Sequence, residues 1–270
     1  MLTHELEIAK RVVRAAADVL REIHRTGPHH IAHKSTAVDL VTEADLASER
    51  LIMEQLRQHF PDDARLGEES GAQGSGKRLW IFDPLDGTTN FAHRLPIFGV
   101  SLALVQEDEV LLGVTCDVVH RRLYWALQGG GAWAQEEGES SPRPIRVSTT
   151  RTLQQAVLAT GFPYDKALSS DNNLAEFGAF LVRTQGLRRA GAATIDLAWV
   201  SEGRLDGYWE QKLKPWDWAA GVLLVKEAGG EVTDYEGNPW HPETPNIVAS
   251  NGHLHAAMLD IIATVRHTSS

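Results

Sequence analysis

The segment LWIFDPLDGTTN at residues 79–90 carries residue types suited to chemistry. An apolar run ends at Asp83, and Asp86 follows in a turn that contains Pro84 and Gly87. Two carboxylates at a strand end can face one point, while Pro84 restricts its own φ and Gly87 lets the backbone approach a ligand. The amides after Gly87 are suited to an anion. The spacing equally fits a tight turn in which each Asp accepts backbone amides, so both interpretations stay open here.

Further carboxylates occur in comparable settings: Asp45 in DLVTEAD, Glu68 and Glu69 in LGEESG, and Asp217 in KPWDWAAG. Clustered carboxylates repel one another unless cations hold them together, and hard oxygen ligands favour Mg²⁺. Two of these acids have a structural alternative. Thr42-x-x-Asp45 has the form of a capping box, and Asp217 precedes an apolar helix that it is able to cap. A capping aspartate can still direct its second oxygen elsewhere.

Histidine and cysteine give little support to a zinc or redox site. The twelve histidines are scattered, and the pair His29-His30 lacks ligand spacing. Cys116 is the single cysteine and lies in the apolar run VLLGVTCDVV, so we expect a buried small hydrophobe and no internal disulfide. The stretch GAQGSGK at 71–77 lacks the Ser/Thr and helix that follow a phosphate-binding loop, and we expect a flexible loop there.

Composition excludes several function classes. The net charge of −10 disfavours direct binding to nucleic acid or anionic lipid. No apolar run approaches the roughly 18 residues that a membrane-spanning helix needs, and the first twenty residues lack the apolar stretch of a secretory signal. We therefore expect a cytoplasmic protein without a membrane role.

Apolar periodicity predicts the elements that position the acids. Helices are expected over 3–26 and over 43–60, where Thr42 is the cap and Pro61 the stop. Short β-rich runs between 79 and 134 predict a mostly antiparallel sheet. The remainder alternates strands with helices, which are expected near 171–184, 193–203, 216–230 and the C-terminus. We expect an internal boundary near 139–146, dividing an N-terminal α+β half (1–140) with most metal ligands from a C-terminal α/β half (141–270) with Asp217, within one catalytic unit.

The residues resemble a known family. WIFDPLDGTTNFAHRLPIFGVSLAL and KPWDWAAGVLLVKEAGG are similar to the paired signatures of the inositol monophosphatase family, within the lithium-sensitive phosphatase superfamily. Supporting strings are KSTAVDLVTEAD, GEESG, GAATIDLAWVSEGRLDGYWE and NIVASNG. They cover most of the chain in the family's order. The resemblance implies an α/β (α+β) fold, the layered α-β-α-β-α sandwich of the inositol monophosphatase and fructose-1,6-bisphosphatase type, commonly a homodimer.

The resemblance also implies a set of metal ligands. Glu68, Asp83 and the carbonyl of Leu85 match a first Mg²⁺ site, and Asp83, Asp86 and Asp217 match a second. Glu68, with Glu69, would help hold a third, weaker ion. Lys34 lies in the loop that the family associates with metal and phosphate.

The remaining site residues follow from the same resemblance. Asp45 and Thr88 match the pair that orients and deprotonates the attacking water, and the amides of Gly87 and Thr88 match the phosphate cradle. The residues that would meet the alcohol half of the substrate are Asp86, Gly191, Ala192, Ala193 and Glu210, with Asp217 beside them. A carboxylate such as Glu210 accepts hydrogen bonds from polyol hydroxyls, or alternatively faces solvent at a strand end.

The function implied is Mg²⁺-dependent hydrolysis of myo-inositol 1-phosphate and related polyol or sugar phosphates. Two metals held by these residues would activate water and stabilise the leaving oxygen, without a covalent enzyme intermediate. Related phosphatases that act on fructose 1,6-bisphosphate, histidinol phosphate, NADP or adenosine 3′,5′-bisphosphate remain alternatives. A further alternative is a regulatory protein-binding role, since one bacterial branch of the family is associated with transcription factors.

Overall fold

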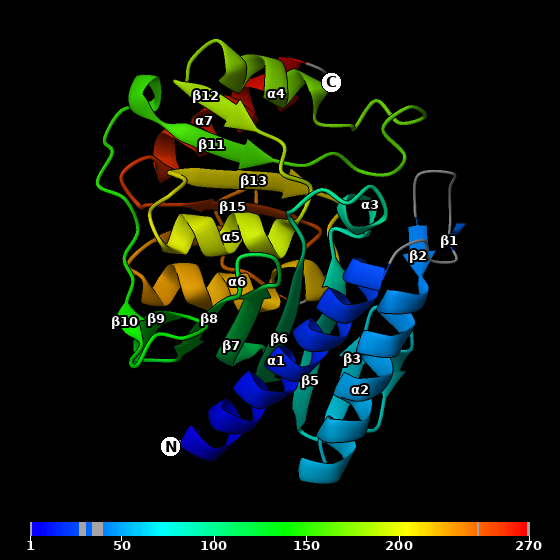
Figure 1. The fold of residues 1–270 in the computed structure, drawn as a ribbon. Coiled ribbons are helices and arrows are strands. Elements are labelled where there is room, and N and C mark those ends of the chain that lie inside the picture. The colour runs from blue at the N-terminus through cyan, green and yellow to red at the C-terminus, as the bar shows by residue number, and fades with distance from the viewer. Residues whose placement is uncertain (1, 27–30, 34–39, 242, 269–270) are drawn as a thin grey trace.

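The structure is a computed structural model that describes residues 2–26, 31–33, 40–241 and 243–268. Two sheets and three layers of helices alternate (Figure 1). Helices α1 and α2 lie on the outer face of the larger sheet, α5 and α6 lie between the sheets, and α4 and α7 cover the smaller sheet (Figure 1). The predicted α-β-α-β-α sandwich is therefore confirmed.

The outer helix layer follows the predicted boundaries closely. Helix α1 spans Thr3–Thr26, and α2 spans Glu43–His59. The predicted capping box at the start of α2 is present, with Thr42 as the N-cap and Asp45 at the third helical position. The apolar faces of both helices pack on one side of the larger sheet around Trp80 and Phe82. A short antiparallel pair, β1 (Ile31–His33) and β2 (Leu40–Thr42), precedes α2.

The larger sheet has eight strands in the order β10-β9-β8-β7-β6-β5-β3-β4. Their bounds are β3 Ala64–Gly67, β4 Gly71–Gln73, β5 Arg78–Asp86, β6 Gly99–Gln106, β7 Glu109–Asp117, β8 Arg122–Leu127, β9 Gly131–Glu136 and β10 Arg143–Pro144. All pairs of neighbouring strands are antiparallel except β3 with β5, which is parallel. The prediction of a mostly antiparallel sheet is confirmed. The expected flexible loop at 71–77 is wrong in part, because Gly71–Gln73 pair with β3.

The smaller sheet has five strands in the order β12-β11-β13-β15-β14. Their bounds are β11 Val157–Thr160, β12 Gly186–Arg188, β13 Gly207–Gln211, β14 Glu231–Thr233 and β15 Asn246–Ser250. A 3₁₀ turn (Leu153–Gln155) precedes β11. Helices α4 (Leu174–Leu181) and α7 (His255–Thr268) pack on its outer face, and α4 is shorter than the 171–184 predicted.

The central helices join the two sheets. Helix α5 spans Ala193–Ser201 and α6 spans Pro215–Glu227, and both are buried on nearly every side. An apolar helix without a polar face is stable only inside such a sandwich. Because α6 packs on the sheet of the N-terminal half, and β10 adds residues 143–144 to that sheet, the two halves interlock. The division at 140/141 stays a prediction.

Two smaller expectations concern burial. Cys116 is 3% exposed and is a free thiol, as predicted. In the part of the chain that the structure describes, we find no helix of the length and apolar character needed to cross a bilayer.

Gly113 in β7 tests the contact that seats α6. A β-carbon at this position would lie 2.7 Å from the carbonyl oxygen of Ala220 and 2.9 Å from its Cα. Gly113→Ala should therefore destabilise the fold by about 1–3 kcal/mol, measured by urea unfolding, because the α6 backbone must move. Gly178→Ala is the control, since nothing lies within 4 Å of its added carbon. Equal stabilities for the two variants would contradict the tight seating of α6.

Candidate active site

The end of β5 places the two central carboxylates. Asp83 pairs with Ser101 of β6, and the register shifts before Asp86 pairs with Gly99. This irregularity lets both carboxylates lie near the same region despite their spacing of three. Asp83 is 1% exposed, and its Oδ1 accepts the N–H of Leu85 at 2.9 Å.

The turn after Asp86 needs glycine. Gly87 has a φ of 90°, and an added β-carbon would lie 3.0 Å from the carbonyl oxygen of Ile97. Both the left-handed conformation and the close approach exclude larger residues. Helix α3 (Thr88–Ala92) begins directly afterwards.

Asp86 is held by a residue more than a hundred positions away. Its Oδ2 accepts the N–H of Thr194 at 2.7 Å and the Thr194 hydroxyl at 2.6 Å. Thr194 lies in the first turn of α5, whose N-cap residue, Ala192, has no side-chain cap. Asp86 thus replaces a local cap, and the helix N-terminus favours its negative charge. The alternative interpretation of Asp86, as an acceptor for amides of its own turn, does not account for this long-range contact.

Asp217 and Asp45 each occupy the first turn of a helix. Asp217 stands at the third position of α6, where its Oδ2 accepts the N–H of Lys214 at 2.6 Å. Asp45 Oδ2 accepts the N–H and the hydroxyl of Thr42 at 2.7 and 2.6 Å. Each acid therefore caps a helix with one oxygen. The other oxygen of Asp45 lies 3.1 Å from the Thr88 hydroxyl.

Thr88 has two acceptors for one proton. Its hydroxyl lies 3.1 Å from Asp45 Oδ1 and also 3.1 Å from the carbonyl oxygen of Leu85. A hydroxyl that donates to a carboxylate keeps its lone pairs available to accept another hydrogen bond. The predicted pairing of Asp45 with Thr88 thus has the contact that a proton relay needs.

Glu68 stands in the turn between β3 and β4, and Glu49 holds this turn. The side chain of Glu49 on α2 accepts the N–H of Glu69 at 2.9 Å and of Ser70 at 2.6 Å. Glu49 is 5% exposed. Sequence reasoning missed it, although an acidic residue within the core-facing positions of α2 was an available signal.

The acids interact electrostatically. Burial raises the pKa of Asp83 well above its ordinary value, and the neighbouring carboxylates raise it further, in the order Glu68, Asp86 and Asp217. Burial likewise raises the pKa of Asp86 to about 6, against the hydrogen bonds from Thr194. The pKa of Asp217 is raised well above its ordinary value by burial and then by the other acids. We call Glu68, Asp83, Asp86 and Asp217 the acidic cluster, because the charges of Glu68 and Asp86 raise the pKa of both Asp83 and Asp217.

The acidic cluster is not a preformed cage. Within the described ranges, no three His, Cys, Asp or Glu side chains are grouped as the ligands of one ion. The side-chain atoms that could bind a metal here are nonetheless all oxygens. Among the described residues, no N–H or O–H group donates a hydrogen bond to Asp83 Oδ2 or Asp217 Oδ1. Hard oxygen donors with mutual repulsion fit a cation such as Mg²⁺, which takes few carboxylates and keeps several waters.

The residues predicted to meet the alcohol lie beside Asp86. Gly191 has a φ of 86°, and Ala192 and Ala193 lead into α5. Glu210 in β13 retains some exposed surface, but desolvation of its carboxyl group raises its pKa to about 7. The charge of Asp86 contributes to that rise, so Glu210 lies within electrostatic reach of Asp86.

Asp196 is a further acid that sequence reasoning missed. It is 1% exposed on α5, and burial followed by the charges of Glu210 and Asp86 raises its pKa well above the ordinary value. Its sequence context, within an apolar helix, gave no sign of acidic neighbours. Lys34 and the pair His29-His30 lie outside the described residues.

Two grooves are lined by residues other than the four acids. One of about 550 Å³ runs along α2 near Arg50 and Arg57, and one of about 580 Å³ lies near Arg189 and Trp199. The candidate site lies where the carboxylates converge, because these groups can bind cations and the volume of a groove does not show what it binds.

Comparison with known proteins agrees with this geometry. A model described as the inositol monophosphatase family matches residues 1–268. The chain belongs to the inositol monophosphatase family. It is accordingly an enzyme of a phosphatase family, as the resemblance implied.

Individual relatives cover nearly the whole chain. An inositol-1-monophosphatase of Synechocystis is 43% identical over 260 residues, which are 96% of this chain and 88% of the relative. A protein of Pseudomonas aeruginosa named Nus factor SuhB is 42% identical over 264 residues, 95% of each chain. The structure of an inositol monophosphatase from Anabaena matches with a TM-score of 0.86 and 40% identity, covering 97% of this chain and 96% of the other.

The raised pKa of Asp83 predicts a cost in stability. The group contributes most favourably to folding while it is protonated, and this contribution is lost as pH rises from the ordinary value of 3.8 through the raised pKa. Without divalent cations at pH 8, Asp83→Asn should therefore raise the Tm, by on the order of 2–4 °C for each kcal/mol relieved. Scanning calorimetry should find a smaller gain at pH 5. A lower Tm for Asp83→Asn at pH 8 would contradict the repulsion.

Proposed function

We propose that the chain hydrolyses phosphate monoesters of small polyols and sugars, with myo-inositol 1-phosphate as the foremost substrate and Mg²⁺ as the cofactor. The single observation that carries the proposal is the acidic cluster of Glu68, Asp83, Asp86 and Asp217 beside the Asp45–Thr88 contact. Oxygen donors of this kind suit a phosphatase that works through divalent ions.

The metal ligands in this proposal are Glu68, Asp83, Asp86, Asp217 and the carbonyl of Leu85, with Glu69 and Lys34 in the adjoining segments. Two or three Mg²⁺ ions held there would supply Lewis-acid stabilisation of the phosphoryl and leaving oxygens and lower the pKa of water. The acids would keep the ions in place, because one oxygen of Asp83, of Asp86 and of Asp217 accepts a hydrogen bond from a backbone amide.

The chain's own residues handle the proton and the phosphate. Thr88 accepts a hydrogen bond from the attacking water and donates to Asp45, which takes the proton. The water oxygen forms a bond to phosphorus as the bond to the alcohol oxygen breaks, and the departing alkoxide takes a proton from solvent. Amides of Gly87 and Thr88 donate to the phosphoryl oxygens.

The alcohol half has its own contacts in this proposal. Glu210 accepts hydrogen bonds from its hydroxyls, and the small residues Gly191, Ala192 and Ala193 leave room beside Asp86. The family resemblance also supports inhibition by lithium and a homodimer, and a cytoplasmic location stays a prediction.

A second candidate is regulatory binding to a protein partner. The observation that favours it is the similarity to proteins named Nus factor SuhB. Assay of phosphate release across inositol, fructose, histidinol and nucleotide phosphates at fixed Mg²⁺ separates the two candidates. Turnover of the polyol esters supports the enzyme, and a folded, Mg²⁺-loaded protein inert to every ester supports the partner.

Asp217→Asn should lower kcat/KM for myo-inositol 1-phosphate by at least about 100-fold, because it removes a charge that the cations need. Phosphate release at saturating Mg²⁺ measures the effect. Asp260→Asn, on the exposed surface of α7, is the control and should retain wild-type turnover. Wild-type kinetics for Asp217→Asn would remove this residue from the site.

Thr88→Ala should lower kcat by about 10²–10⁴-fold, the usual contribution of positioned proton transfer, with a smaller effect on the Mg²⁺ concentration for half-activation. Thr88→Ser keeps the hydroxyl and should recover much of the rate. If the alanine variant turns over at the wild-type rate, Asp45 and Thr88 form no relay.

A further inference from the structure

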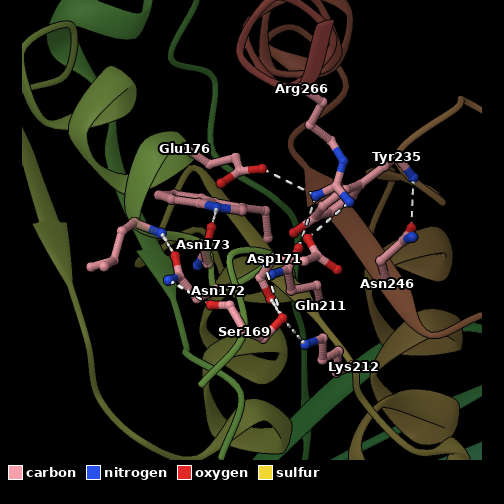
Figure 2. Close-up of polar contacts among 12 residues, drawn as sticks. Ser169, Asp171, Asn172, Asn173, Glu176, Gln211, Lys212, Tyr235, Asn246 and Arg266 are labelled. Carbon is pink, nitrogen blue, oxygen red and sulfur yellow. Dashed lines mark hydrogen bonds and ion pairs between the residues drawn. The ribbon is translucent and has the colours of Figure 1, made fainter. Parts of the chain in front are cut away.

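The backbone around Glu210 is fixed on both sides by buried polar contacts. Before it, the Trp209 indole donates to Asn173 Oδ1 at 2.7 Å, and Asn173 Nδ2 donates to the carbonyl oxygen of Gly161 at 2.6 Å. After it, Gln211 Oε1 accepts from Arg266 at 2.9 Å (Figure 2). Strand β13 is therefore held rigidly where Glu210 projects.

Lys212 closes the same network. Its Nζ donates to Ser169 Oγ at 3.1 Å (Figure 2) and to both carboxylate oxygens of Asp165 at 2.7 and 3.0 Å. The loop before α4 is thereby tied to the end of β13. With the main chain anchored, the orientation of the Glu210 carboxylate depends on what its own oxygens contact.

Tyr208 and Gly161 contact that carboxylate directly. Residues two apart in a strand share a face, so Tyr208 and Glu210 both face α5. The Tyr208 hydroxyl donates to Glu210 Oε2. On the other side, a β-carbon at Gly161 would overlap both carboxylate oxygens. Gly161 thus leaves the space that the Glu210 carboxylate occupies, and the hydrogen bond from Tyr208 orients that carboxylate.

The Tyr208 hydroxyl keeps a proton to donate in this contact. Burial raises the pKa of Tyr208 well above its ordinary value, and the charges of Glu210 and Asp196 raise it further. The phenol therefore stays protonated at neutral pH. Among the described residues, no donor other than Tyr208 reaches the carboxylate, so Glu210 Oε1 remains to accept a hydroxyl of a ligand.

We propose that Tyr208 is a positioning residue that sets selectivity for hydroxyl-bearing alcohols, by holding one oxygen of Glu210 so that the other accepts a substrate hydroxyl. This inference rests on the proposed polyol-phosphatase function. An acceptor held in a fixed orientation discriminates against ligands without the matching donor, because binding such a ligand desolvates the acceptor without compensation.

The test compares two esters in Mg²⁺-loaded enzyme: myo-inositol 1-phosphate, and p-nitrophenyl phosphate, whose alcohol half carries no free hydroxyl. Tyr208→Phe should lower the ratio of their kcat/KM values by about tenfold, mainly through KM for the inositol ester, as expected for a weakened hydrogen bond to a charged group. In a Glu210→Gln background the same substitution should lower the ratio by less.

Tyr124→Phe is the matched control. Tyr124 is also fully buried and its hydroxyl donates to a glutamate, Glu202, at 2.9 Å, but neither residue belongs to the acidic cluster. The control should leave the substrate ratio at its wild-type value. Gly161→Ala tests the same carboxylate from the opposite side and should also lower the ratio.

Equal losses on both esters, or an unaltered ratio in Tyr208→Phe, would overturn the inference. If Tyr208→Phe does not fold, Gly161→Ala decides by the same ratio. A wild-type enzyme that hydrolyses both esters without preference also overturns the inference while the phosphatase function stands. Failure of the proposed function differs, because the wild-type protein then releases phosphate from neither ester.

Discussion

Mutual repulsion among buried carboxylates is the constraint on which the site depends. Glu68 and Asp86 lie close enough to Asp83 and Asp217 that their charges raise the pKa of both in a poorly solvated region. The fold offsets part of this cost by fixing carboxylate oxygens with backbone amides, mostly at helix N-termini. The remaining cost is what a divalent cation would relieve. Without such an ion, the repulsion among these carboxylates destabilises the fold.

The layered architecture is what brings these helix N-termini together. Helices α5 and α6 lie between the sheets, so their first turns reach the end of β5, while α2 delivers Asp45 from the opposite face (Figure 1). Helix α6 packs closely on β7 at Gly113, and this contact fixes the position of α6 and therefore of Asp217 in its first turn. The smaller sheet then supplies Glu210 on the far side. The metal-binding acids, the water relay and the alcohol contact that we propose thus come from different layers of the fold.

Local signals in the sequence predicted local structure well. The apolar spacing of 3–26 and 43–60 and the Thr42-x-x-Asp45 box gave two helices nearly to the residue, because these features act within a few positions. The resemblance supplied the acids and the sandwich. Long-range partners were beyond reach: Glu49 acts through amides twenty residues away, and Asp196 becomes notable only when β13 brings Glu210 beside it. The strand at Gly71–Gln73 was missed because glycine-rich composition indicates a turn.

Anomalous diffraction from crystals of the protein grown with Mn²⁺, a hard cation that substitutes for Mg²⁺, tests the central claim most directly. The account predicts at least two anomalous peaks within bonding distance of Asp83, with Glu68, Asp86 and Asp217 drawn in as ligands. Peaks confined to other surface carboxylates, with none beside Asp83, would contradict it.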